Sequence, residues 1–215
     1  MPLFGRNRQV NKRLEREVSG LVFRNPLGSP SSGLVKFASF IVTYPPKDNV
    51  INWLSDIKKH YPGKIAVVRI ADDFQRLFSL SYDFADILLI DTDLGGGINA
   101  MDISDTVNLL DSLLALRLCY EKYTPVYLKI SNEVTSEELK TLLSYCRMSG
   151  IDGIAAQSIN KLQAIREASQ GRIPVMGFTQ DSDEALKMLE EGASVVQLDT
   201  NLLLFKRTLK ILEKQ

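Results

Sequence analysis

Short, almost uninterrupted apolar runs recur along the chain and alternate with segments in which apolar residues are spaced by three or four positions. Continuous apolar runs of this length are typical of parallel strands that are covered on both faces. The runs are rich in β-branched residues and lie at 37–44, 64–71, 85–93, 124–131, 150–158, 172–180 and 193–200. The spaced segments predict amphipathic helices that pack on those strands. The clearest of them are 49–60, 103–123, 135–150 and 181–192.

Residues with preferences for helix ends agree with this alternation. Thr135 and Glu138 have the spacing of a capping box, and Asp181 or Ser182 begins a later helix. Gly150 stands where the helix that starts at Thr135 should end, because glycine adopts the left-handed conformation of many helix C-caps. The pattern therefore predicts seven βα units between 37 and the C-terminus.

An eighth strand is expected at NPLGSPSS (25–32), although the helix after it is almost absent because GLVK leads directly into the next run. Alternating strands and helices form either a closed barrel or an open doubly wound sheet. Eight strands with no glycine-rich phosphate fingerprint after the first favour an α/β fold, a (β/α)8 TIM barrel. The chain is close to the lower limit of about 200 residues for that fold.

Upstream of the first strand, EVSGLVFRN (17–25) places a glycine-centred turn between two extended pieces. This pattern predicts a hairpin that covers the N-terminal end of the barrel. We therefore expect one domain over 1–215, in which 1–24 form a lead-in and hairpin and 25–215 form the barrel.

The composition indicates which cellular environment and which classes of partner to expect. Lys plus Arg and Asp plus Glu number 26 each, so no global field favours nucleic acid or a membrane surface. No apolar run reaches the roughly 18 residues of a membrane helix, and the first twenty residues lack the apolar core of a secretory signal. Cys119 and Cys146 fall in helical segments and are expected to be small core residues, so a reduced, cytoplasmic protein is predicted. His60, the single histidine, is expected on the surface at a helix end, which leaves no His-based metal site or triad.

In a barrel of this kind the functional groups lie at the C-terminal ends of the strands. Lys129 stands out there, because an ammonium at the end of an apolar strand must be paired or solvated. Asp91, at the end of the neighbouring strand, is the expected partner. The pair is either a plain ion pair that closes the barrel or a ligand-facing cation whose charge is set by a carboxylate. The candidate ligand-binding residues are Ser29, Tyr44, Asp91, Asp93, Lys129, Gln157, Thr179 and Thr200, while Arg69 and Asp199 also lie at strand ends.

The stretch DLGGGINAMD (93–102) follows the fourth strand with three consecutive glycines. Such a loop can wrap a phosphate, move as a lid or serve as a connector. It lacks the Lys-Ser/Thr ending of a P-loop, so the phosphate signal is weak.

The segments GLVFRNPLGSPSSG (20–33), FASFIVTYPP (37–46) and ADILLIDTD (85–93) together resemble the dihydroorotate dehydrogenases. The later segments PVYLKIS (125–131), GIDGIAAQS (150–158) and the stretch 173–200 continue the likeness over almost the whole chain. The resemblance implies an FMN-binding TIM barrel of pyrimidine biosynthesis, a small-molecule ligand and a homodimer. It places Lys129 at the flavin-contacting lysine and Thr200 in a phosphate-binding segment.

Several positions depart from that family. Its catalytic base aligns with Leu94, which cannot accept a proton, and a family lysine aligns with Tyr44. The paired glycines whose amides hold the flavin phosphate are replaced near Thr179 and Gln180. Phosphate binding needs exposed amides without a neighbouring Cβ, and proton abstraction needs a base within reach of the substrate.

Three functions follow from this comparison. The first is a catalytically silent, dihydroorotate-dehydrogenase-like barrel that binds a ligand or partner. The second is an active FMN-dependent oxidoreductase of the dihydroorotate dehydrogenase type, or a barrel that binds flavin or a related ligand without that chemistry. The third is a different small-molecule enzyme that uses Asp91, Asp93 and Lys129 as acid, base or Schiff-base former.

Overall fold

Eight parallel strands form a closed barrel in the computed structural model, which describes residues 14–30, 33–46, 48–93 and 101–214. The order is β10-β3-β4-β5-β6-β7-β8-β9, so the last strand pairs with the first, and the open doubly wound sheet is excluded. Each of the seven predicted runs contains one strand, and the eighth lies in 25–32 as expected. The strands are β3 (Leu27–Ser29), β4 (Phe40–Thr43), β5 (Ile65–Ile70), β6 (Ile87–Asp91), β7 (Val126–Lys129), β8 (Gly153–Ala156), β9 (Val175–Thr179) and β10 (Val195–Leu198).

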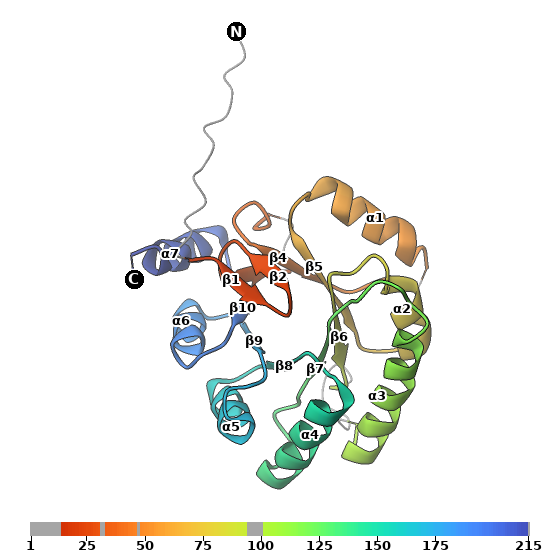
Figure 1. Ribbon diagram of the computed structural model, residues 1–215. Coiled ribbons are helices and arrows are strands. Elements are labelled where there is room, and N and C mark those ends of the chain that lie inside the picture. The colour runs from red at the N-terminus through yellow and green to blue at the C-terminus, as the bar shows by residue number, and fades with distance from the viewer. Residues whose placement is uncertain (1–13, 31–32, 47, 94–100, 215) are drawn as a thin grey trace.

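Helices surround the strands and bury their apolar faces against the outside of the barrel (Figure 1). They are α1 (Val50–His60), α2 (Phe74–Ser81), α3 (Ile103–Arg117), α4 (Ser136–Ser149), α5 (Ile159–Ser169), α6 (Ser182–Glu190) and α7 (Leu202–Leu212). Turns occupy 33–37 between β3 and β4, as the short GLVK linker predicted. The capping box at Thr135 and Glu138 is present, and Gly150 ends α4 with φ 84°. None of the helices in the described ranges combines the length and apolar character that crossing a membrane requires.

The helix predicted over 103–123 is shorter than expected, and its end changes the environment of one cysteine. α3 ends at Arg117, and the next amides bond three residues back, as from Cys119 N to Leu116 O at 3.0 Å. Tyr120 then stacks on Tyr82 with ring centroids 4.2 Å apart, which draws the chain back toward the barrel. Cys119 is consequently exposed, so its prediction as a core residue was wrong, whereas Cys146 is buried as expected.

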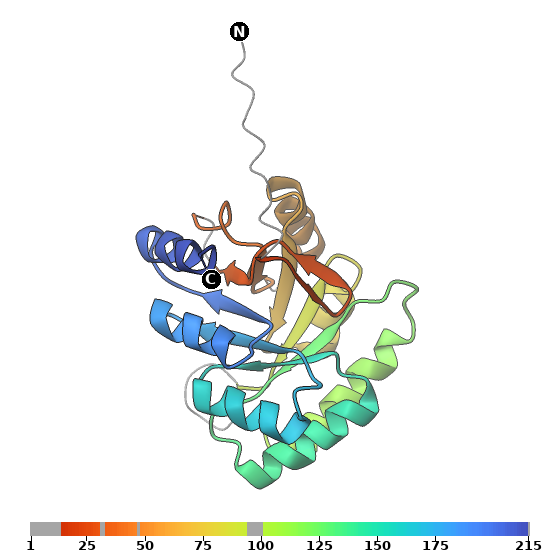
Figure 2. The ribbon, with the colours of Figure 1, turned by 60° about the vertical axis from the view of Figure 1, so that its left-hand side comes forward.

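A β-hairpin covers one end of the barrel, as the sequence predicted (Figures 1 and 2). β1 (Arg16–Val18) and β2 (Leu21–Phe23) pair antiparallel around Ser19 and Gly20, whose φ angles are 50° and 76°. Two consecutive positive φ angles are typical of the tight turn that matches the twist of a hairpin. Val18 and Phe23 are buried with the side chains that fill the barrel interior.

Alternate residues of each strand point into the barrel, and two glycines make room for large rings there. A Cβ on Gly28 would lie 2.2 Å from the ring of Phe40, and one on Gly153 would lie 2.4 Å from the ring of Tyr127. In the barrel interior, large rings therefore occupy the space beside glycines, and together these residues fill the barrel without a pore.

The hydroxyl of Tyr127 lies 2.8 Å from Ser19 Oγ, where the hairpin meets the barrel interior. Burial raises the pKa of Tyr127 to about 12, because the phenolate would be desolvated there. The unfolded chain therefore ionises first as the pH rises past about 10, and the folded state loses stability from there to about pH 12.

Tyr127→Phe is expected to lower the free energy of unfolding by about 1 kcal/mol at pH 7 through the lost hydrogen bond. It should also remove about 1 kcal/mol of the alkaline loss measured between pH 9 and 11. Urea unfolding at both pH values tests this, with Tyr61→Phe, at the end of α1, as the matched control. An unchanged alkaline loss in Tyr127→Phe would contradict the assignment.

Candidate functional site

The interior positions of the strands change from apolar to charged at the C-terminal end of the barrel. Continuing the interior alternation from Val67, Leu89 and Tyr127 brings Arg69, Asp91 and Lys129 into one layer. Asp91 lies directly opposite Lys129 in the β6–β7 ladder. The mouth of the barrel is therefore polar because the strand alternation carries these side chains inward.

Arg69, Asp91 and Lys129 form one ion-pair network together with Asp93. Lys129 Nζ lies 3.1 Å from both Asp91 Oδ1 and Asp93 Oδ2, and Arg69 Nε donates to Asp91 Oδ2 at 2.6 Å. The backbone amide of Asp93 also donates to Asp91 Oδ1 at 3.1 Å. The side chains of Asp91 and Lys129 are each only 1 % exposed. The predicted ion pair is confirmed, and the structure adds Arg69 and Asp93 to it.

The network leaves the ammonium of Lys129 enclosed. Two carboxylates occupy its donors, and its side chain contributes no surface to the cavity above it. A Schiff-base lysine must present a neutral amine to a carbonyl carbon. The geometry instead suits a structural role, in which Lys129 holds two acidic side chains in place.

A cavity of about 630 Å³ opens at the mouth above this layer. Its size falls within the range of small-molecule sites. The Arg69 guanidinium lies 4.8 Å from the ring centroid of Tyr44 and 5.9 Å from that of Phe178. Desolvation raises the pKa of Tyr44 above its ordinary value of 10.0. The lining residues are Pro30, Tyr44, Arg69, Asn132, Gln157, Phe178, Thr179, Gln180, Asp181, Glu184, Gln197 and Asp199.

The structure separates the predicted residues into three groups. Tyr44, Gln157 and Thr179 line the cavity, while Asp91, Asp93 and Lys129 belong to the ion-pair layer. Two others are not among the lining residues: Ser29 is fully buried in β3, and Thr200 is half-buried after β10. The proposed base position, Leu94, and most of the glycine-rich stretch lie outside the described residues.

Sequence reasoning did not select three of the residues that define the cavity. Gln197 lies in β10 two positions before Asp199, Phe178 lies in β9 one position before Thr179, and Glu184 lies in the first turn of α6. The signal available for Gln197 was a lone polar residue within an apolar run. Arg69 was noted at a strand end, but its contact with Asp91 needs the tertiary structure.

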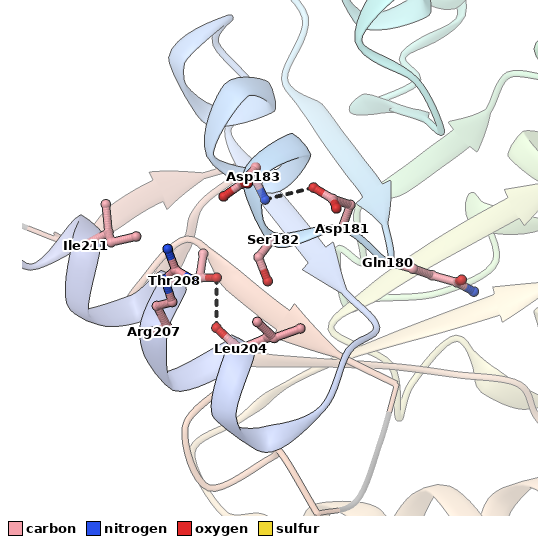
Figure 3. Close-up of a pocket in the computed structure, with 8 residues that line it drawn as sticks. All are labelled: Gln180, Asp181, Ser182, Asp183, Leu204, Arg207, Thr208 and Ile211. Atoms are coloured by element: carbon pink, nitrogen blue, oxygen red, sulfur yellow. Dashed lines mark hydrogen bonds between the residues drawn. The ribbon is translucent and has the colours of Figure 1, made fainter.

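Helices α6 and α7 begin directly after β9 and β10, at the place where many TIM barrels bind phosphate. Asp181 Oδ1 accepts from the amide of Asp183 at 2.8 Å (Figure 3) and from the amide of Glu184 at 2.7 Å. At α7, Asn201 Oδ1 accepts two amides in the same way, each at 3.0 Å. Both helices thus cap their own first-turn amides with a side chain.

Acidic side chains also lie near the N-termini of α6 and α7. Asp183 and Glu184 lie in the first turn of α6, directly after its N-cap Asp181, and Asp199 precedes α7. Thr179 Oγ1 donates to the Glu184 carboxylate, so this hydroxyl is also engaged. A gap of about 120 Å³ between α6 and α7 is small for a ligand. Bonded amides and nearby carboxylates both disfavour a phosphate at these two helix N-termini.

Two further observations bear on the chemistry of the mouth. Among the described residues, no group of three or more His, Cys, Asp or Glu side chains is arranged to hold a metal ion. His60 lies exposed in the last turn of α1, with Nδ1 2.7 Å from Asp56 O. That turn precedes β5, so it lies at the opposite end of the barrel from the mouth.

Solved structures with the same fold include two of dihydroorotate dehydrogenase (DHODH) from Eimeria tenella. The complex with ferulenol has a TM-score of 0.74 and 13% sequence identity, over 96% of this chain and 85% of that one. The ligand-free form has a TM-score of 0.73 and 12% identity, over 99% and 88%. Comparison with protein-family models and with curated proteins gives no match. At this identity the likeness establishes a DHODH-like TIM barrel and does not extend to activity.

Proposed function

We propose that this protein is a catalytically silent DHODH-like barrel that binds a small molecule at its mouth without using flavin chemistry. The observation that carries the proposal is the state of the two helix N-termini after β9 and β10. Two first-turn amides of each helix are bonded to Asp181 or Asn201, and the carboxylates of Asp183, Glu184 and Asp199 lie near these termini. A phosphate there would lose the amide hydrogen bonds and meet like charge.

The ion-pair layer supports the same proposal. Asp91 accepts hydrogen bonds from both Arg69 and Lys129, so its carboxylate oxygens are already engaged and are not free to take a proton from a substrate. Lys129 is enclosed by two carboxylates, which argues against the Schiff-base enzyme. The cavity above the layer retains the size and the aromatic walls of a ligand site. The homodimer implied by the resemblance stays a prediction.

The visible absorbance spectrum tests this proposal directly. We expect the purified protein to be colourless and to retain no flavin band after incubation with excess FMN and desalting. We also expect no dye reduction on addition of dihydroorotate. A known FMN-binding protein taken through the same steps is the control for recovery. A retained flavin band with dihydroorotate turnover would establish the alternative, an active FMN-dependent dehydrogenase.

A further inference from the structure

One buried polar atom at the mouth has no hydrogen-bond partner among the described residues. Gln197 projects from β10 into the cavity and is 9% exposed. Its Oε1 is buried and accepts no hydrogen bond from any described residue. Buried acceptors are almost always satisfied, by protein, by water or by a ligand. The atom therefore marks a place for an N–H or O–H donor.

The charge of the mouth selects among such donors. Arg69 is the one cation among the lining residues, and Asp91 already neutralises it through Nε and a terminal nitrogen. Lys129 is likewise neutralised beneath the cavity. Among the described residues, the mouth holds two cations, Arg69 and Lys129, and five carboxylates, Asp91, Asp93, Asp181, Glu184 and Asp199.

The walls restrict the shape of the ligand. Tyr44 and Phe178 each present a flat aromatic surface near the Arg69 guanidinium. Carboxamides from Asn132, Gln157 and Gln180 add both donors and acceptors around the rim. Aromatic walls with a few directed polar groups are typical of sites for planar small molecules.

We propose that the mouth selects planar, cationic nitrogen ligands of the amidinium type over anions of the same shape. The ligand donates to Gln197 Oε1, and its charge faces the carboxylates of Glu184 and Asp199. The inference rests on the proposed function, because it takes the mouth to be a ligand site free of flavin. It names the chemical class that this site accepts.

Three probes of nearly equal size separate charge from shape: benzamidine, benzamide and benzoate. Their affinities are measured by isothermal titration calorimetry at constant ionic strength and pH 7. We expect benzamidine to bind at least tenfold more tightly than benzoate, with benzamide between them, and tenfold equals about 1.4 kcal/mol. Equal or tighter binding of benzoate would overturn the proposal.

Two variants assign the contacts. Gln197→Leu should weaken benzamidine and benzamide by similar factors of about five to ten, because both lose the acceptor. The variant should fold normally, since no described residue donates a hydrogen bond to the amide oxygen. Asp199→Asn should weaken benzamidine by a few-fold and leave benzamide unchanged. Asp83→Asn, an exposed change at the opposite end of the barrel, is the matched control and should alter neither affinity.

The outcomes separate this inference from the proposed function. No binding of any probe by a flavin-free protein would overturn the inference and leave the proposed function standing. A retained flavin band together with the expected probe order would overturn the proposed function and support the charge preference. Loss of benzamidine binding in Asp83→Asn to the same degree as in Asp199→Asn would place the probe elsewhere and overturn the inference.

Discussion

Replacing Asp91 by leucine is expected to lower the free energy of unfolding by about 3–5 kcal/mol, because the change leaves the charges of Lys129 and Arg69 without their main partner. Lys129 is 1% exposed and cannot reach solvent without disturbing β7. Chemical denaturation at pH 7 gives the measurement. The loss should be larger than for Asp93→Asn, since the Asp93 side chain is 33% exposed and water can replace its contact.

The double variant Asp91→Leu with Lys129→Met tests whether the network is structural. It removes both buried charges and leaves Arg69 and Asp93, whose side chains are 15% and 33% exposed. We expect it to recover most of the loss seen in Asp91→Leu, because apolar replacement of a buried ion pair is often close to neutral. If the double variant lost as much unfolding free energy as Asp91→Leu and Lys129→Met lose together, a purely structural pair would be contradicted.

Replacing Phe23 by alanine is expected to cost about 3–5 kcal/mol, the range for removing a fully buried aromatic side chain. Phe23 is 0% exposed and meets Phe40 edge to face, with ring centroids 5.5 Å apart. The change opens a cavity between the hairpin and the barrel interior. The same denaturation experiment measures it.

Val22→Ala is the control for the hairpin itself. Val22 lies next to Phe23 in β2 but is 58% exposed, so its truncation should change stability by less than about 0.5 kcal/mol. Equal losses in the two variants would show that the hairpin contributes through its own pairing and not by covering the barrel.

Local patterns account for most of what the sequence predicted correctly. Apolar runs and three- to four-residue spacing depend on neighbouring residues, so the strands, most helices and the capping box at Thr135 could be read directly. The hairpin turn at Ser19 and Gly20 is also local. The prediction was wrong at the end of α3, where the helical spacing of apolar residues continues to Tyr123 but the helix ends at Arg117. Stacking of Tyr120 on Tyr82, a contact between distant segments, decided that end.

The site was predictable only where adjacency followed from the order of the strands. Asp91 and Lys129 end neighbouring strands, so their pairing could be expected, and the structure confirms it. The sequence alone thus determined the barrel, its hairpin and this one contact. Tertiary structure decided that Arg69 joins the pair and that Ser29 is not among the lining residues of the cavity. It also decided that Gln197 faces the cavity with an oxygen that accepts no hydrogen bond from the described residues. These outcomes depend on the tilt and closure of the barrel, which bring together residues of strands far apart in sequence.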